Sequence, residues 1–361
     1  MMFSFPRFRE PDFSVEPFFS APNASVKQAG DGYLPEDFYA TTIFPEYIKI
    51  DGKWVLVKES RMDSAVVITD GEPKAVEPRN VKKGDMIVVG REDDGRGGVY
   101  VHSNAFEDDN DEEDGAVFAF RTGKSRESSY SEDYDKLYNI LRNDRDNGYI
   151  VWVLGPACVF DHDSRAAMSK LIDKGYCHAL FAGNALATHD LEASIFNTGL
   201  GQDIYTKRLM KNGHYNHLHT INLVKTEGGI LQFLEKYNIN SGVMNSLIKN
   251  DVPYVLAGSI RDDGPLPEVI SDAYAAQTAM RSYTKKATVV IALATQLHTI
   301  ATGNMTPSFT VKNSIVRPVY FYSVDISEFA VNKLRDRGSL SVTGIVTNIQ
   351  DFLVNMERNL E

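Results

Sequence analysis

Three polar stretches and one isolated acid carry the residue types that could do chemistry in this chain. His189-Asp190 lies in the segment AGNALATHDLEA, directly after a strand-like apolar run. Arg261-Asp262-Asp263-Gly264 and Thr295-Gln296-Leu297-His298 follow two later apolar runs, and Asp325 ends another. Loops at the carboxyl ends of parallel strands are where such folds hold ligands, whereas a core-building segment needs no polar cluster there. The pattern therefore predicts one ligand site formed by several strand-end loops.

The same loops suit a nucleotide-sized ligand. Glycines at positions 155, 183 and 258 let the backbone approach a ligand closely, and the helix N-termini that follow present N–H groups to phosphate. An acid at a strand tip commonly takes the two ribose hydroxyls of a dinucleotide, and Asp325 is placed for that role. The chain holds neither a G-x-G-x-x-G motif nor a P-loop. Spacing alone therefore predicts a nucleotide-sized ligand and no more.

Two histidine-containing segments lie next to the predicted strand ends. His298 comes just past a strand, which favours a role in the site over a role in the core. His189-Asp190 falls in the first turn of a predicted helix, where Asp190 either complements the helix dipole or takes part in catalysis. Both readings of Asp190 stay open at this point.

Two other clusters could suggest a metal ion. GHYNHLHT places His214, His217 and His219 close together, but no cysteine or carboxylate stands at a familiar ligand spacing. We expect a helix N-terminus or a pocket wall there. The acidic run EDDNDEEDG, residues 107–115, lacks the spacing and the final Glu of an EF-hand, which favours a solvated loop over a calcium loop. We therefore predict no metal site.

The N-terminal part of the chain must form a small β domain. Residues 1–32 hold scattered prolines and phenylalanines, which predict an extended arm that packs its aromatic rings on a body or a neighbouring subunit. Residues 33–120 form short alternating runs, with Asp51-Gly52 as a hairpin signal between two of them. Residues 121–148 are typical of a linker that leads into a helix.

In the remaining residues, 149–361, the pattern of apolar residues is different. Six apolar runs alternate with helical patterns, and polar loop residues follow each run. The runs are YIVWVLGPA, YCHALFAGN, VPYVLAGS, ATVVIALAT, RPVYFYSVD and SVTGIV. Near-continuous apolar strands that alternate with helices predict a parallel sheet covered on both faces. The fold class is therefore α/β, with a small β-rich domain followed by a doubly wound, Rossmann-like domain.

Composition excludes some partners. The 361-residue chain is 43% hydrophobic and has a formal net charge of −11, so nucleic acid and anionic membranes are poor candidates. No run approaches the 18 apolar residues that cross a bilayer, and the start has no secretory pattern. Two lone cysteines, Cys158 and Cys177, fit a reducing compartment. We expect a cytoplasmic protein.

Several segments closely resemble a known family. GPA, AGNALATHDLEA, VLAGSIRDDGPLPEVISD, ATQLHTIATGN and GIVTNI are similar to the archaeal-type ornithine cyclodeaminases, first described as the LOR/SDH conserved region. The same region forms the C-terminal part of bacterial arginine dihydrolase/ornithine cyclodeaminase fusions. LPEDFYATT, ESRMDSAVVI and KKGDMIVVG resemble the small β domain that precedes it. The similarity runs from about Tyr33 to the C-terminus.

The resemblance implies an NAD-dependent enzyme that converts L-ornithine to L-proline and ammonia without net consumption of NAD, and that is a homo-oligomer. It also implies the positions that hold NAD: Asn184, Ala185, Asp263, Thr295, Gln296, Leu297, His298, Asp325, Asn348 and Ile349. Two of these depart from the family pattern. Asn348 stands where the family usually has Asp, and Gln296 is unusual in its loop; both could shift cofactor affinity.

The expected chemistry assigns roles to four residues. Arg261 suits the substrate carboxylate because its guanidinium pairs bidentately, although it could instead tie down its own loop through a neighbouring Asp. Asp262 or Asp190 could bind the δ-ammonium or move protons, with His189 as a second proton carrier. Two alternatives remain: an NAD enzyme for another amino or imino acid, and a catalytically silent NAD-binding regulatory module.

Overall fold

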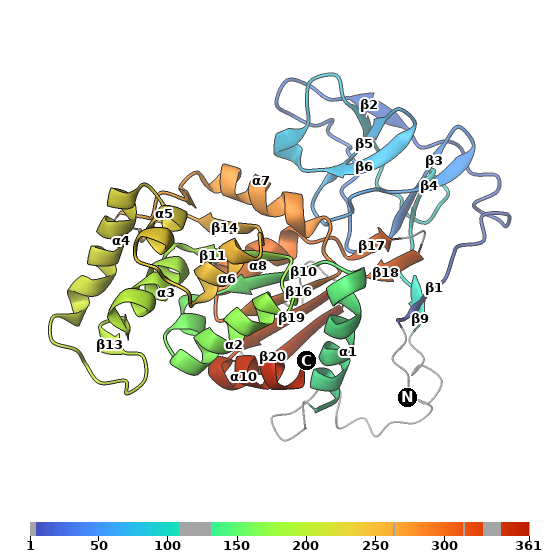
Figure 1. The fold of residues 1–361 in the computed structure, drawn as a ribbon. Helices are drawn as coiled ribbons and strands as arrows, with labels where there is room; N and C mark the ends of the chain where they lie inside the picture. The colour runs from blue at the N-terminus through green and yellow to red at the C-terminus, as the bar shows by residue number, and fades with distance from the viewer. Residues whose placement is uncertain (1–4, 108–130, 263, 313–314, 328–340, 361) are drawn as a thin grey trace. The chain divides into compact units, whose positions relative to one another are not determined.

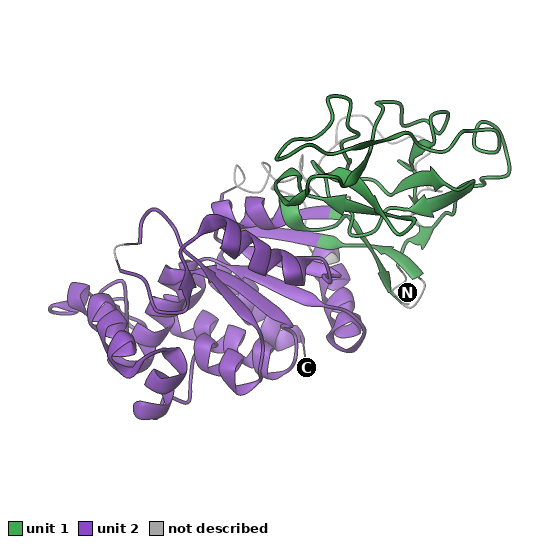
Figure 2. Ribbon diagram, turned by 90° about the horizontal axis from the view of Figure 1, so that it is seen from above, with its two compact units in different colours: residues 1–129, 304–320, 338–341 green, residues 130–303, 321–337, 342–361 purple. Residues whose placement is uncertain are grey.

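The computed structural model describes residues 5–107, 131–262, 264–312, 315–327 and 341–360. They divide into two compact units, the first made of residues 1–129, 304–320 and 338–341 and the second of residues 130–303, 321–337 and 342–361 (Figure 2). The boundaries differ from the expected ones in two places. Residues 304–320, predicted within the α/β domain, belong to the first unit. Helix α1 (Ser131–Asn147), predicted as the helix that follows the linker, is grouped with the second unit.

The first unit is built from short antiparallel strands. One sheet has the order β2–β7–β5–β6 and the other the order β4–β3–β8. Their bounds are Val26–Gln28 (β2), Glu46–Ile50 (β3), Lys53–Leu56 (β4), Ala65–Thr69 (β5), Glu72–Val76 (β6), Met86–Val88 (β7) and Val99–Val101 (β8). Asp51 and Gly52 both have positive φ between β3 and β4, which confirms the predicted hairpin.

The N-terminal arm packs on this same unit. Phe13 stacks on Trp54 with ring centroids 5.1 Å apart, and the Lys49 ammonium donates to the carbonyl oxygens of Phe18, Phe19 and Ala21. Strand β1 (Arg7–Phe8) pairs with β9 (Phe106–Glu107), and β17 (Phe309–Lys312) pairs with β18 (Ile315–Pro318). The arm is therefore part of the β unit rather than a separate region.

The second unit holds a seven-stranded sheet in the order β15–β14–β11–β10–β16–β19–β20 (Figure 1). Its strands are Ile150–Leu154 (β10), Ala179–Gly183 (β11), Tyr254–Ala257 (β14), Val269–Ile270 (β15), Val289–Leu293 (β16), Tyr320–Asp325 (β19) and Ser341–Val346 (β20). All six predicted strands are present. The pairs β10–β11, β11–β14, β14–β15 and β10–β16 are parallel.

The chain winds outward from β10 in two directions. It runs through β11 and β14 on one side, and then returns to β16, β19 and β20 on the other. This leaves a topological switch point between β10 and β16, where folds of this class bind ligands at the carboxyl ends of the strands. A Cβ atom at Gly155, just after β10, would lie 2.0 Å from the Ala294 carbonyl oxygen, so only glycine lets the two strand ends come this close.

Helices cover both faces of the sheet. Figure 1 shows α2 (His162–Asp173) and α10 (Ile349–Asn359) on one side and α7 (Ala273–Thr284) on the other. The remaining helices of the unit are α3 (Asn184–Phe196), α4 (Asn216–Glu227), α5 (Ile230–Lys236), α6 (Val243–Lys249) and α8 (Gln296–Met305). Every residue of β10 and of β16 is buried, which explains the absence of alternation in their sequences.

Local signals fix the helix ends as the sequence predicts. The Asp161 carboxylate accepts from the N–H groups of Asp163 and Ser164 at the start of α2, and Gly175, with φ of +83°, follows its end.

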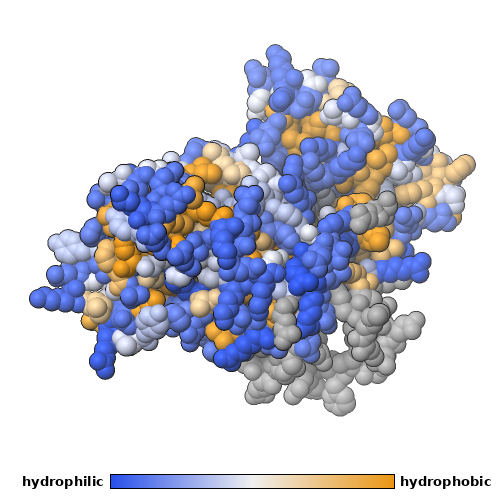
Figure 3. Space-filling model, viewed as in Figure 1, coloured by the Kyte–Doolittle hydropathy of each residue, from blue (hydrophilic) through white to orange (hydrophobic). Residues whose placement is uncertain are grey.

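On the face drawn in Figure 3, hydrophilic residues predominate and hydrophobic ones form separate patches. Within the described residues, no helix combines the length and the apolar character needed to cross a membrane.

Candidate active site at the strand ends

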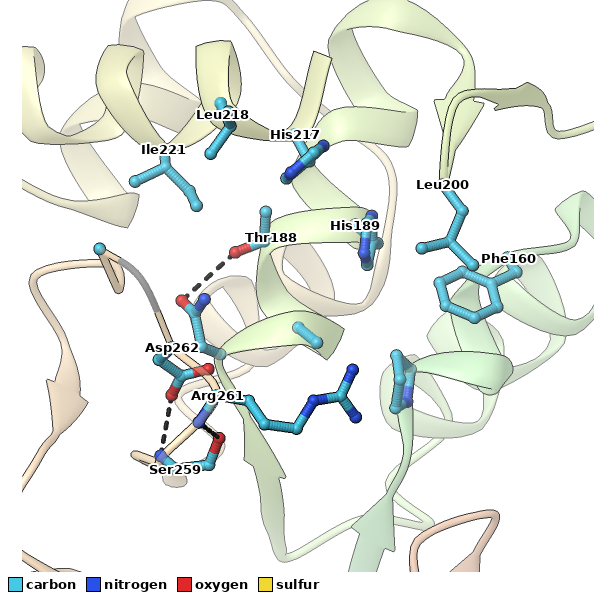
Figure 4. A pocket seen from close by; sticks show the side chains of 14 residues that line it. Phe160, Thr188, His189, Leu200, His217, Leu218, Ile221, Ser259, Arg261 and Asp262 are labelled. Carbon is cyan, nitrogen blue, oxygen red and sulfur yellow. Dashed lines mark hydrogen bonds between the residues drawn. The ribbon is translucent and has the colours of Figure 1, made fainter. Parts of the chain in front are cut away.

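A cavity of about 480 Å³ opens at the carboxyl ends of β10, β11 and β14. It is bounded by the loops after these three strands and by α3 and α4 (Figure 4). The lining residues are Pro156, Phe160, Asn184, Ala185, Thr188, His189, Leu200, His217, Leu218, Ile221, Ser259, Arg261, Asp262 and Gly264. Five of the predicted site residues are among them, namely Asn184, Ala185, His189, Arg261 and Asp262.

Asn184 joins two walls of this cavity. It opens α3 directly after β11, and its side-chain oxygen accepts from the Leu266 N–H at 3.0 Å and from the Thr188 hydroxyl at 3.3 Å. The first bond ties the loop after β14 to the start of α3. Asn184 therefore holds the site together, and its amide oxygen already has two donors.

His189 lies on the cavity wall and is almost fully buried. Its Nδ1 atom is 2.7 Å from Oε2 of Glu192, one turn further along α3. The Phe160 ring packs edge-on against the imidazole with centroids 5.2 Å apart, and the His217 ring lies 6.0 Å away. Nε2 is thus the ring nitrogen left for a ligand in the cavity.

Arg261 and Asp262 lie on a tight turn after β14. The Asp262 carboxylate accepts from the Ser259 N–H at 2.9 Å, and the Arg261 N–H donates to the Ser259 hydroxyl at 3.1 Å. The guanidinium of Arg261 makes no hydrogen bond or ion pair with any residue that the structure describes, so it does not tie down its loop through Asp262. Asp263 lies outside the described residues. The free guanidinium is available for an anionic group such as a carboxylate.

Asp190 does not fit the catalytic role, which was one of the two readings left open for it. Its carboxylate is completely buried, and Oδ1 accepts from Nε of Arg165 at 2.7 Å and from the Val243 N–H at 3.0 Å. Oδ2 accepts from the Met244 N–H at 2.8 Å. Asp190 is absent from the cavity lining. It joins α2, α3 and the N-terminus of α6, which is a structural role.

The other half of the strand-end rim is much tighter. A small cavity of about 10 Å³ lies between the ends of β16 and β19, and Thr295, Gln296 and Asp325 are among the residues that line it. One Asp325 oxygen accepts from the Ser327 N–H at 2.9 Å. The other makes no bond within the described part of the chain. These three predicted NAD positions therefore lie together, but apart from the large cavity.

His298 lies between the two halves. Its Nδ1 atom is 3.3 Å from the Thr295 hydroxyl, and its Cε1 atom would be 3.2 Å from a Cβ atom at Gly183. Burial lowers the pKa of His298, and the negative charge of Asp262 opposes this shift. His298 is thus close to the end of β11 as well as to the loop after β16. Leu297, next to it, is 71% exposed.

Asn348 and Ile349 begin α10 after β20. The Asn348 side chain accepts from the N–H groups of Gln350 and Asp351, so it is the helix N-cap. Asn and Asp cap helices about equally well, so the departure from the family pattern preserves the cap. Ile349 is buried. The Gln350 amide is 3.5 Å from the Ala157 carbonyl oxygen, which brings this helix N-terminus beside the loop after β10.

The apolar wall of the large cavity was not expected from the sequence. Phe160, Leu200, Leu218 and Ile221 form it, and they come from three segments with no common motif. Leu218 and Ile221, three residues apart on α4, are the one pair whose spacing places both on the same side of a helix. His217 does line the cavity, as the pocket-wall reading of GHYNHLHT predicts.

Among the described residues there is no His, Cys, Asp or Glu cluster suited to a metal ion. Apart from Glu107, the acidic run lies outside them.

A doubly wound sheet whose strand-end segments bring a histidine, an arginine and an aspartate to one cavity is typical of the Rossmann-like class of α/β proteins, which bind ligands at this edge. Residues 135–356 match the family described as arginine dihydrolase ArgZ-like, C-terminal, Rossmann fold, and residues 45–130 match its first region. The chain belongs to this family. The fold class and the resemblance identified in the sequence are both confirmed.

Relatives of known name span most of the chain. The ornithine cyclodeaminase of Methanocaldococcus jannaschii is 41% identical over 92% of this chain and 76% of its own length. The bifunctional arginine dihydrolase/ornithine cyclodeaminase ArgZ of Synechocystis is 37% identical over 91% of this chain, which corresponds to 45% of that longer protein.

Solved structures agree with the fold over nearly the whole chain. The crystal structure of a conserved LOR/SDH protein from Methanococcus maripaludis has a TM-score of 0.84 at 35% identity, covering 94% of this chain and 98% of that one. The ternary complex of AgrE with ornithine and NAD⁺ has a TM-score of 0.58 at 32% identity, covering 94% of this chain and 46% of that one.

Proposed function

We propose that this chain is an NAD-dependent ornithine cyclodeaminase, which converts L-ornithine to L-proline and ammonia. Five archaeal relatives with that name are 36–41% identical over at least 90% of this chain. AgrE, a relative at 32% identity, binds both ornithine and NAD⁺. The observation in this structure that carries the proposal is the free Arg261 guanidinium in the same cavity as the Nε2 side of His189.

The strand ends offer the donors and acceptors that a dinucleotide needs. Asp325 has a carboxylate oxygen for ribose hydroxyls, and the N-termini of α8 and α10 have N–H groups for phosphate. We assign the adenosine side of NAD to the β16–β19 half, near Thr295, Gln296 and Asp325. Asn184, Ala185 and His298 then flank its reactive end. When bound there, NAD supplies the chemistry of removing a hydride from the substrate Cα atom and returning it later.

The residues of the large cavity bind and orient the substrate. Arg261 pairs with the α-carboxylate. Among the described residues that line the cavity, Asp262 is the only carboxylate, and it suits the δ-ammonium group. His189 accepts a proton at Nε2 from a substrate ammonium group, and the substrate nitrogen becomes nucleophilic. His189 then returns the proton to the departing ammonia. Phe160, Leu200, Leu218 and Ile221 exclude water from the methylene chain and from the imine carbon.

The products of the reaction provide the test of the proposed function. Ornithine loses its α-nitrogen as ammonia while the δ-nitrogen closes the ring, and the hydride leaves and returns to the same carbon. Incubation of the protein with L-ornithine and NAD should therefore give proline and ammonia in equal amounts with no accumulation of NADH. Turnover of lysine or another amino acid in place of ornithine would indicate the alternative substrate. No turnover of any amino acid would favour the regulatory module.

The setting of the enzyme is part of the proposal. A role in proline formation from ornithine follows from the reaction. Cytoplasmic location is supported by two buried free cysteines, Cys158 and Cys177. A homo-oligomer is supported by large apolar side chains exposed on the α/β unit, such as Leu209 and Tyr215. Light scattering coupled to size-exclusion chromatography would give the subunit number.

A further inference from the structure

We propose that Glu192 is a positioning residue, which fixes the orientation and the tautomer of His189 so that Nε2 faces the substrate as a proton acceptor. The inference rests on the proposed function, because it assigns a second residue to the proton transfer in that reaction. Glu192 itself is not among the residues that line the cavity. It acts through His189.

The Glu192 carboxylate is held at both oxygens. Its side chain is completely buried, and Oε2 lies 2.7 Å from Nδ1 of His189. Oε1 accepts a hydrogen bond of 2.7 Å from the Thr198 hydroxyl, on β12 (Thr198–Gly199). The Thr198 oxygen in turn accepts from the Asn216 amide nitrogen at 2.8 Å, at the start of α4. Three segments that surround the cavity thus meet at this carboxylate.

The direction of these bonds sets the tautomer. An amide nitrogen can only donate, so the single hydroxyl hydrogen of Thr198 is free to point at Glu192. With Glu192 ionised, both of its oxygens accept, and Nδ1 of His189 carries the proton that lies between the two side chains. The lone pair of the neutral ring is left on Nε2, toward the cavity. A third group that orients a general base in this way is a recurrent feature of catalytic sites.

The hydrogen-bond partners of Glu192 leave its charge directed at His189. The described residues include no lysine or arginine bonded to this carboxylate, so its partners are His189 and the neutral Thr198 hydroxyl. A buried carboxylate without a full cationic partner is costly. Its hydrogen bond to His189 becomes stronger when the imidazole is protonated, because both partners are then charged.

Asp190, two positions earlier on α3, shows what a structural carboxylate looks like. It has an arginine and two backbone N–H groups as donors, and none of its partners lines the cavity. Ser194 belongs to the same structural group, since its hydroxyl binds Arg165 and the Asp190 carbonyl oxygen. Ser194→Ala is therefore a matched control on the same helix.

The test combines kinetics with the state of the ring. In the full-length protein, we expect Glu192→Gln to lower kcat with ornithine by about 100-fold, within the usual range for general acid–base catalysis, with KM changed less than about threefold. Ser194→Ala should keep kcat within about twofold because it leaves the His189 ring untouched. The His189→Gln/Glu192→Gln double variant should be no slower than His189→Gln alone, since both changes remove one function.

Nitrogen-15 NMR of histidine-labelled protein measures the tautomer without turnover. The chain has 8 histidines, and the signals lost in His189→Gln identify the ring. We expect the proton on Nδ1 in the wild type and a shift toward Nε2 in Glu192→Gln. A proton on Nε2 in the wild type, additive losses in the double variant, or an unchanged kcat in Glu192→Gln would each overturn the inference. Failure of the wild type to form proline would overturn the proposed function instead, and the NMR result would still stand.

Discussion

The two halves of the strand-end rim in the α/β unit differ in room and in the use of their polar groups. The β10–β11–β14 half encloses about 480 Å³, and a guanidinium and a histidine nitrogen there have no partner among the described residues. The β16–β19 half has only about 10 Å³ between its strand ends. One Asp325 oxygen there is already bound to backbone.

This difference indicates a division of labour. Groups left without partners in a roomy cavity suit a substrate that must enter, react and leave. The strand-tip carboxylate and the helix N-termini of the other half suit the ribose hydroxyls and the phosphates of a bound cofactor. Variants in the first half should therefore change catalysis and substrate affinity, and variants in the second should change NAD affinity.

The largest expected effect is in the roomy half. His189→Gln removes the proposed proton carrier while keeping a polar side chain, so kcat with ornithine should fall by about 10²–10⁴-fold. NAD affinity, measured by isothermal titration calorimetry, should stay within about twofold. A His189→Gln variant with weakened NAD binding and near-normal kcat would contradict the division between the halves.

Arg261 comes next. Arg261→Lys keeps the charge but loses the fork that pairs with a carboxylate, and we expect KM for ornithine to rise by about 10–100-fold, the equivalent of one charged hydrogen bond. The change in kcat should be smaller. Arg96→Ala, at a side chain that is 74% exposed in the β unit, is the matched control and should leave steady-state kinetics unchanged. A rise in the Kd of NAD in Arg261→Lys, with KM for ornithine unaffected, would place Arg261 on the cofactor instead.

Helix α3 shows how much of the site could be predicted from the sequence. The apolar run before it, the polar residues at its start and the strand-end location were all readable, because burial on both faces and helix capping leave local signals. The roles of its two carboxylates were not. Asp190 meets Arg165, 25 residues earlier, and Glu192 meets Thr198, whose hydroxyl oxygen accepts from Asn216. Local pattern cannot distinguish them, since only tertiary packing decides which acid receives an arginine.

The same limit applies at the domain level. Phe309–Lys312 and Ile315–Pro318 were predicted within the α/β domain, but they form an antiparallel hairpin grouped with the β unit. The apolar wall of the cavity was missed for a related reason. Phe160, Leu200 and Leu218 come from separate segments, so no single stretch of sequence has the composition of a pocket.

A variant in the β16–β19 half should change the kinetics in a different way. Asp325→Asn keeps the backbone contact to Ser327 but removes the charge that suits ribose hydroxyls, so the Kd of NAD should rise by about tenfold, or 1.4 kcal/mol. Because the reacting groups lie in the other half, kcat at saturating NAD should remain within about twofold. Titration calorimetry with NAD alone, followed by assays at increasing NAD, separates the two quantities. Wild-type NAD affinity in Asp325→Asn would remove the adenosine side from this half.

His298, which lies between the halves, should give the smallest effect, and it concerns stability. Burial lowers the pKa of His298 in the folded protein below the usual value of 6.5, and Asp262 only partly opposes this. The unfolded chain therefore binds a proton at a higher pH than the folded one, and the folded state loses stability as the pH falls below about 6.5. Above that pH both states are neutral at this position and His298 contributes no pH dependence. Between pH 7.5 and pH 5.5, the drop in melting temperature should be smaller in His298→Gln than in the wild type. An equal drop in the two proteins would mean that His298 is as easily protonated as in the unfolded chain, and that the junction between the halves is open to water.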